Sequence, residues 1–135
     1  MKKALVKTLQ KKYPELFGES TSSNDMRMKI FVSGIECDDG WYELIDVLCE
    51  SIMLICGKNI PTIRQIKEKF GGLRFYIAPL TDKHNAEKIF NLINKAESAS
   101  FIICEVCGEK GEMKTNKAEW LKTLCPVHAK ELKYE

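Results

Sequence analysis

Apolar residues recur at helical spacing in two early parts of the chain. Residues 2–12 predict an amphipathic helix with a lysine-rich outer face, ended by Pro14. We interpret the lysines as a solvated face, with phosphate binding as the alternative. A longer apolar stripe predicts the most buried helix, ended by Gly57 and capped by Asp38, Asp39 or Gly40. Its predicted members are Trp41, Leu44, Ile45, Leu48, Ile52, Ile55 and Cys56, widened by Val47, Met53 and Leu54.

A third helix is predicted to begin at Thr81 or Asp82 and to fray near residue 98. Its predicted buried stripe consists of Ala86, Ile89, Phe90, Ile93 and Ala96. Alternation of apolar and polar residues over positions 28–32 predicts a short strand, and the small polar residues at 18–25 predict a loop.

A β-hairpin is predicted around Gly71 and Gly72, which separate two alternating runs. If Phe70 and Leu73 flank the turn, counting outward gives the cross-strand pairs. These pairs are Lys69 with Arg74, Glu68 with Phe75, Lys67 with Tyr76 and Ile66 with Ile77. One face is then apolar except for Glu68, and the other carries Gln65, Lys67, Lys69, Arg74 and Tyr76.

Metal-ligand residues come in two pairs near the C-terminus. Cys104 and Cys107 are separated by two residues and followed by Gly108, and Cys125 and His128 repeat the spacing. Three thiolates and an imidazole are a donor set for tetrahedral Zn²⁺. Protein atoms would fill all four positions, so the sequence predicts a structural zinc ion without a position for a reactive water.

The zinc segment is predicted to fold as a knuckle, a hairpin and a helix. Residues 112–115 and 120–124 suit short strands, and Pro126 suits the first turn of a helix over residues 127–132. This order resembles a treble-clef zinc finger. A segment of about 35 residues is too short for a core of its own, so metal should supply much of its folding free energy.

These elements predict an α+β fold. An antiparallel hairpin or sheet packs with two or three helices in residues 1–100, and a treble-clef-like zinc-binding subdomain in residues 101–135 packs on it.

Composition narrows the setting of the protein. The 135 residues are 44% hydrophobic and 30% charged, which is typical of soluble globular chains. A net charge of +2 is too small to indicate nucleic acid without a local basic patch. We find neither a signal-peptide pattern nor a run of the about 18 apolar residues that a membrane span needs. We therefore expect a cytoplasmic protein with no membrane partner and with reduced cysteines.

Three motifs in this order resemble a family of small phage and prophage-encoded proteins. They are Asp39-Gly40-Trp41-Tyr42, the decapeptide KEKFGGLRFY at residues 67–76, and the two cysteine-containing pairs. The resemblance covers residues 35–128. It implies a viral or prophage origin and a role in the host cytoplasm, with a host or defence protein as a candidate partner. It carries no catalytic residue over to this chain.

Catalytic chemistry has limited support in the sequence. Of the two histidines, His128 is assigned to zinc and His84 lies near a helix start, which leaves no evident partner for a nucleophile. Glu36, Asp38 and Asp39 can hold Mg²⁺, but acids before a helix are more often caps. Whether the chain is an enzyme stays open, and a binding module is favoured.

The basic hairpin face is the predicted binding site. Like charges opposite one another on a sheet are destabilising, whereas Arg74 can fork onto phosphate or carboxylate oxygens and Tyr76 can stack. We therefore predict that Lys67, Lys69, Arg74 and Tyr76 bind nucleic acid or a nucleotide-like anion. The alternatives are a protein–protein interaction, a zinc protein within a larger assembly, and lysines that splay into water without a ligand. Glu68 is expected to pair with a basic residue of another element.

Overall fold

The computed structural model describes residues 1–18, 34–80 and 83–135. The predicted strand at 28–32, most of the predicted loop and the cap at Thr81 or Asp82 lie outside the described residues. The described elements are α1 (Lys3–Lys12), a 3₁₀ turn (Asp39–Trp41), α2 (Tyr42–Cys56), β1 (Ile63–Lys69), β2 (Gly72–Ile77), α3 (Lys83–Ser100), β3 (Glu112–Thr115), β4 (Leu121–Leu124) and α4 (Pro126–Glu131).

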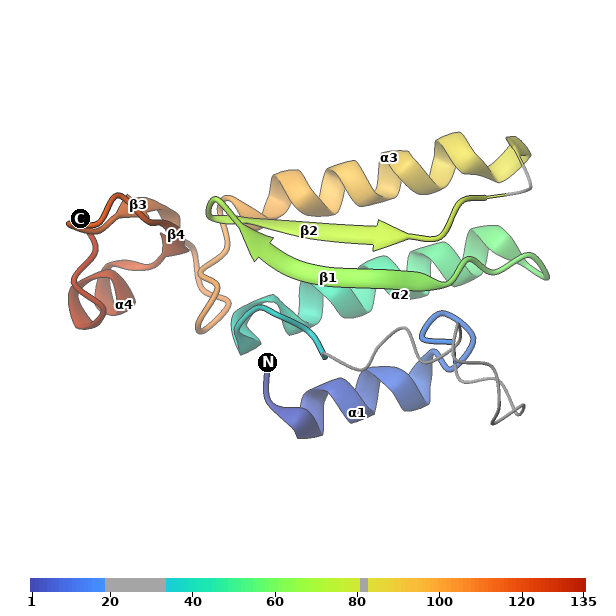
Figure 1. Ribbon diagram of the computed structural model, residues 1–135, viewed down its shortest axis with the longest axis horizontal. Coiled ribbons are helices and arrows are strands. Elements are labelled where there is room, and N and C mark those ends of the chain that lie inside the picture. The colour runs from blue at the N-terminus through green and yellow to red at the C-terminus, as the bar shows by residue number, and fades with distance from the viewer. Residues whose placement is uncertain (19–33, 81–82) are drawn as a thin grey trace.

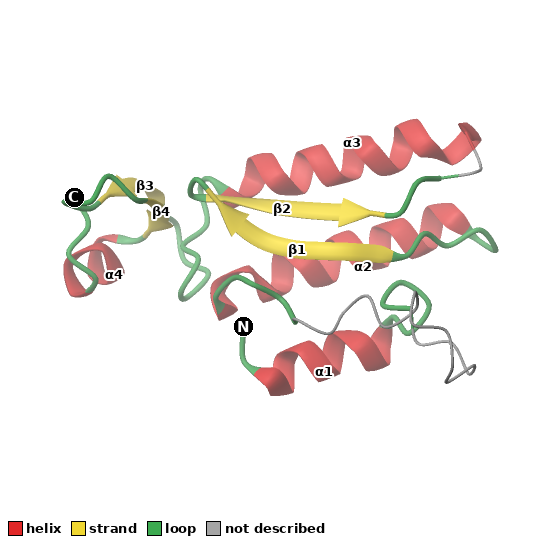
Figure 2. Cartoon of the chain, in the orientation of Figure 1, coloured by secondary structure: helices red, strands yellow, loops and turns green. Residues whose placement is uncertain are grey.

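The predicted α+β class is confirmed by two small antiparallel sheets and the helices around them (Figures 1 and 2). The hairpin β1–β2 lies with α2 and α3, and α1 runs beside α2. The part made of β3, β4 and α4 lies beyond the turn of that hairpin, at one end of the long axis. Among the described helices, none is long and apolar enough to cross a bilayer.

The main core forms where the apolar faces of α1, α2, α3 and the first hairpin meet. Its fully buried side chains include Leu9, Trp41, Ile45, Ile52, Ile63, Ile66, Leu73 and Ile89. Three residues assigned to this core by their spacing are exposed instead: Val47, Leu54 and Phe90, at 60%, 81% and 50%. Val47 and Leu54 are seven residues apart and so share one face of α2, which the neighbouring helices leave uncovered.

The start of α2 differs from the prediction. Neither Asp38 nor Asp39 caps the helix with its side chain; a 3₁₀ turn leads into it instead. Asp39 Oδ1 accepts the backbone N–H of Lys2 at 2.9 Å. The Asp38 carboxylate lies 3.5 Å from Lys122 Nζ in the C-terminal part of the chain. The two acids therefore join separate segments rather than begin a helix.

The turn of the first hairpin lies one residue earlier than predicted. Lys69 pairs with Gly72, so the central turn residues are Phe70 and Gly71. Their φ angles are 53° and 82°, and positive φ at both centres is the signature of a type I′ turn, whose twist matches the strands. The prediction failed because Gly72, although a glycine, already belongs to the strand.

The shift changes the pairs but not the faces. Every partner moves by two positions, and side chains alternate with a period of two along a strand. Ile66, Leu73 and Phe75 are buried as predicted, whereas Phe70 is 66% exposed at the turn. At the open end, an irregularity between Ile63 and Gln65 shifts the register by one residue, so that Ile63 lies opposite Ile77.

Both edges of the β1–β2 hairpin have partners. Glu36 exchanges backbone hydrogen bonds with β1 in a short parallel bridge. On the β2 edge, the N–H of Leu73 donates to Ser100 Oγ at 2.9 Å and that of Phe75 donates to Glu97 Oε1 at 3.1 Å. Side chains of α3 thus take the place of a third strand.

Candidate metal centre

Cys104, Cys107, Cys125 and His128 converge in the C-terminal part of the chain. Their ligand atoms all lie within 4.8 Å of one another. The first two cysteines flank a tight loop after α3, Cys125 follows β4, and His128 lies in α4. Soft thiolates and an imidazole in this arrangement can hold a metal ion. No second group of three or more such ligands comes together within the described ranges, so the magnesium hypothesis for Glu36 and its neighbours gains no support.

The loop between the first two ligands is a tight knuckle. The N–H of Gly108 donates to the carbonyl of Cys104 at 2.9 Å, and the N–H of Cys104 donates to the carbonyl of Glu109 at 2.7 Å. Gly108 has a φ of 82°, a conformation that glycine adopts without steric cost. The predicted knuckle is confirmed, and these backbone hydrogen bonds fix the loop that carries the first two sulfurs.

The thiols ionise unequally in the metal-free chain. The backbone N–H of His128 lowers the pKa of Cys125 to about 7, because it stabilises the thiolate. Desolvation raises the pKa of Cys107 to about 11, and hydrogen bonds that its protonated thiol makes to the Cys104 and Cys125 sulfurs add to the rise. Contact with the Cys125 sulfur raises the pKa of His128. The cluster therefore resists joint ionisation until a cation compensates the charge.

A buried carboxylate inside the knuckle ties it to the body of the protein. Glu105 is 2% exposed, and its Oε2 lies 2.9 Å from Lys122 Nζ. Its Oε1 accepts the backbone N–H of Asp38 at 3.2 Å, and its carbonyl accepts the N–H of Gly40 at 2.7 Å. Burial raises the pKa of Glu105 despite the nearby ammonium. The contacts connect the metal loop with the 3₁₀ turn before α2.

Gly40 and Trp41 complete this junction. A Cβ at Gly40 would lie 2.2 Å from the carbonyl oxygen of Cys104. Gly40 is not among the described glycines with positive φ, so the close approach of the Cys104 backbone, and not an unusual φ, requires glycine here. Trp41 is fully buried, and its Nε1–H donates to the carbonyl of Ile103 at 2.9 Å. The Asp-Asp-Gly-Trp motif thus joins the two parts of the molecule.

The tip of the first hairpin makes a second junction. Thr123 is buried, and its hydroxyl donates to the carbonyl of Gly71 at 2.7 Å. A Cβ at Gly71 would lie 2.5 Å from the sulfur of Met113, and one at Gly72 would lie 2.4 Å from the ring of Phe101. The two glycines of the decapeptide are therefore a packing surface for the C-terminal part.

The basic hairpin residues share one face as predicted, with different partners. Lys67, and not Lys69, lies opposite Arg74, because the turn of the hairpin lies one residue earlier than predicted. Lys67 Nζ lies 5.9 Å from the ring centroid of Tyr76, which is 42% exposed. Arg74 Nη1 donates to the carbonyl of Leu73 at 3.0 Å. The predicted binding residues therefore form one cluster at mid-strand, with Lys69 nearer the turn.

Glu68 has a role that the sequence did not predict. Its Oε1 accepts the N–H of Gly71 at 2.7 Å, so it closes the turn of its own hairpin and does not form an ion pair with another element. The position of the turn explains this role. Because Gly71 is a central turn residue, its N–H lies within reach of the Glu68 side chain at the end of β1.

Sequence patterns gave no warning of Glu105, Lys122 and Thr123 as docking residues. Thr123 and Glu105 are polar residues that are almost completely buried, and their partners lie far away in the sequence. Only the position of Glu105, between the ligands Cys104 and Cys107, could have indicated its role. A residue in such a tight loop contacts any segment that packs against the metal centre.

Comparison of the chain with protein-family models, curated proteins and solved structures gives no match. The likeness to phage proteins, the treble-clef assignment and the division near residue 100 stay predictions.

Proposed function

We propose that this protein is a zinc-stabilised binding module whose basic hairpin face binds nucleic acid or a nucleotide-like anion. Zn²⁺ holds the C-terminal part together through Cys104, Cys107, Cys125 and His128, and the docking contacts place that part against the hairpin tip. The metal has a structural role in this proposal, and the hairpin supplies the binding residues.

The ligand spacing fits a tetrahedral metal ion, and the donor set of three thiolates and an imidazole favours zinc. For a tetrahedral ion with Zn–S bonds of 2.3 Å, sulfurs lie about 3.8 Å apart and a sulfur and a nitrogen about 3.6 Å. The Cys107 and Cys125 sulfurs are 3.8 Å apart, and Cys104 Sγ is 3.7 Å from His128 Nδ1. The Cys125 Sγ to Nδ1 distance is 3.2 Å, slightly closer than this ideal. With four protein ligands the ion has no open position, which favours a structural ion over a catalytic one.

The arrangement of Lys67 and Arg74 carries the binding proposal. Two cations directly opposite one another weaken a sheet. No carboxylate in the described parts of the chain lies within ion-pair distance of Lys67, Lys69 or Arg74. An anion that bridges the two strands would remove the repulsion and gain charge-assisted hydrogen bonds from the guanidinium.

The aromatic neighbour favours an anion that also has a flat surface. Tyr76 lies beside Lys67 on the same face, and a phenol ring stacks on a nucleobase. A nucleotide offers phosphate oxygens to Lys67 and Arg74 and a base to the Tyr76 ring. An acidic side chain offers only the oxygens.

An interaction with a host protein is the second candidate. Val47 and Leu54 form an exposed apolar face on α2, which a partner helix or sheet can cover. Together with the resemblance to phage accessory proteins, this face supports a factor that modulates a host or defence protein. Such binding would depend little on salt, whereas phosphate binding weakens steeply as salt rises.

The test uses Lys67→Ala, Arg74→Ala and Tyr76→Ala, with Lys95→Ala on the exposed side of α3 as the matched control. Binding to single-stranded oligonucleotides and to nucleoside triphosphate is followed by fluorescence anisotropy at two salt concentrations, alongside thermal melts and zinc analysis. We expect weaker binding in the three hairpin variants, with unchanged folding and zinc content. Equal binding by all four variants would contradict the proposal. The ultraviolet absorbance ratio of the purified protein gives a first indication of co-purified nucleic acid.

A further inference from the structure

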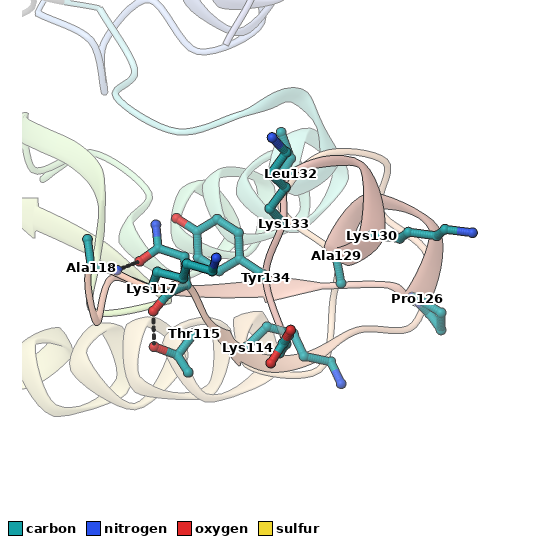
Figure 3. Close-up of a pocket in the computed structure, with 12 residues that line it drawn as sticks. Lys114, Thr115, Lys117, Ala118, Pro126, Ala129, Lys130, Leu132, Lys133 and Tyr134 are labelled. Carbon is teal, nitrogen blue, oxygen red and sulfur yellow. Dashed lines mark hydrogen bonds between the residues drawn. The ribbon is translucent and has the colours of Figure 1, made fainter.

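A second surface, on the C-terminal part, combines cations with an aromatic side chain. A hollow between the β3–β4 turn and α4 is lined by Lys114, Lys117, Lys130, Lys133 and Tyr134, among others. Figure 3 shows these lysines coming from both sides, with Tyr134 between the turn and the helix. Glu135 is the one acidic residue of the lining. The hollow and its lysines are called the lysine-rimmed hollow below.

Most of these lysines have no internal partner. Lys114 lies 3.5 Å from an exposed carboxylate, that of Glu112. Among the described residues, no ion pair includes Lys117, Lys130 or Lys133. Three free ammonium groups around one concave surface produce a positive potential that attracts a polyanion.

Trp120 stands on the turn that borders this hollow. Its side chain is 71% exposed, whereas that of the other tryptophan, Trp41, is fully buried. So much exposure is unusual for a tryptophan, because its large ring is mostly buried in folded proteins. The turn is held firmly: Asn116 Oδ1 accepts the N–H groups of Ala118 and Trp120, both at 3.0 Å, and the N–H of Asn116 donates to the Trp120 carbonyl at 3.1 Å. The indole is thus presented to solvent on a preorganised support.

Lys133 gives independent support because it occupies a position that favours glycine. Its φ is 61°, at the residue after the C-cap of α4, where the Tyr134 N–H donates to the Ala129 carbonyl at 2.8 Å. This is the Schellman pattern, in which glycine is the usual residue at the left-handed position. A lysine there strains the backbone, and retained strain points to a role in function.

From these contacts we infer that the lysine-rimmed hollow and Trp120 form a second binding site, for single-stranded nucleic acid. Free ammonium groups bind successive phosphates, and the indole stacks on an unpaired base. A duplex should bind more weakly, since its bases already stack on one another and leave only the phosphates for the lysines. The site is separate from the hairpin face and binds whether or not the hairpin does.

The test measures Trp120 directly. In full-length, zinc-loaded Trp41→Phe protein, Trp120 is the remaining tryptophan, and titration with oligothymidylate should quench its emission. Oligouridylate in a parallel titration separates DNA from RNA as the ligand. Trp120→Ala should weaken binding by about tenfold, the effect of losing one stacked base. Lys95→Ala, a matched loss of one exposed lysine, should leave it unchanged.

Lys133→Gly separates binding from stability. Glycine relieves the strained conformation, so the melting temperature should stay the same or rise. Binding should weaken, and the slope of log affinity against log salt should fall by about 0.7, the effect of one lost phosphate contact to a single strand.

Two results would overturn the inference. One is unchanged affinity of Trp120→Ala together with unquenched Trp120 emission in the oligonucleotide complex. The other is equal quenching by polyglutamate, which would assign the surface to an acidic protein. If Arg74→Ala loses binding and Trp120→Ala does not, the proposed hairpin function stands and the second site is rejected. If Trp120→Ala loses binding and Arg74→Ala does not, the second site stands and the proposed hairpin function is rejected.

Discussion

The body of the protein and its C-terminal part are held together by different forces. The body buries a continuous apolar cluster drawn from α1, α2, α3 and the first hairpin. The C-terminal part has four buried core residues, Cys104, Leu124, Cys125 and Ala129, and two of them are metal-ligand candidates. So small a core cannot offset the conformational entropy of its segment, whereas a bound metal can. The two regions should therefore respond differently to metal removal and to core mutation.

Metal removal should have the largest effect. In Cys104→Ser, or with a chelator, we expect residues 101–135 to lose amide protection while the helices of the body stay folded, because only the former depend on the ion. Hydrogen exchange with elemental analysis measures both. Binding should release protons, so metal affinity should fall as pH falls.

Cys37→Ser is the matched control, since Cys37 is buried outside the ligand set. It should keep one zinc ion per chain. Full zinc retention in Cys104→Ser, or loss only in Cys37→Ser, would refute the ligand assignment.

Trp41→Ala should be the most destabilising change in the body, by about 3–5 kcal/mol, because it empties a fully buried site. Denaturant unfolding measures this. Trp41→Phe keeps most of the volume and loses the hydrogen bond to Ile103, so it should cost about 1 kcal/mol. A similar loss of unfolding free energy in both variants would show that the hydrogen bond to Ile103 contributes more to stability than the volume of the buried ring.

Gly40→Ala tests the junction between the regions. The added methyl group would overlap the backbone of Cys104 and Glu105, so we expect a loss of about 1–3 kcal/mol and faster hydrogen exchange in the C-terminal part. Gly34→Ala is the comparison, because a Cβ at Gly34 meets nothing within 4 Å. That variant strains only its own backbone, at a φ of 73°, and should leave exchange in the C-terminal part unchanged.

The contact between α1 and α2 should depend on pH. Asp46 binds Lys12 Nζ and the Tyr13 hydroxyl, and these hydrogen bonds outweigh desolvation and lower the pKa of Asp46. A lowered folded-state pKa stabilises the fold above the ordinary pKa, and the effect disappears as pH falls through the folded-state value. Asp46→Asn should therefore cost about 1–2 kcal/mol near neutral pH and less in acid. A constant difference between the melts at all pH values would contradict this.

Phe70→Asn should produce the smallest change, and a favourable one. Asn followed by Gly is the preferred type I′ turn pair, and Asn tolerates positive φ better than Phe. We expect a gain of about 0.5–1 kcal/mol in the unfolding free energy of the body, measured with urea. A loss would show that the exposed ring packs against the C-terminal part.

The sequence was informative where a pattern is local. The helices at Lys3–Lys12, Tyr42–Cys56 and Lys83–Ser100 follow from apolar spacing, and the metal-ligand set follows from two short motifs. Local spacing could not show which part of an apolar stripe is covered, so Val47, Leu54 and Phe90 were placed in the core although they are exposed.

The turn and the docking contacts depend on partners far away in the sequence. A glycine pair usually marks the two central residues of a turn. Here Gly72 lies in the strand instead, and it is a glycine because a larger residue would overlap the Phe101 ring. Glu105 and Thr123 are polar residues buried only because they meet Asp38 and Gly71. No single-sequence pattern encodes such pairs.

The side chains that cover the β2 edge also limit how this protein can associate. Open strand edges recruit further strands, in aggregates and in complexes with peptides. Ser100 and Glu97 occupy the outward N–H groups of β2, so neither another copy nor an extended peptide can extend the sheet there without displacing them. The hairpin stays a two-stranded unit, and recognition is left to the side chains on its open face.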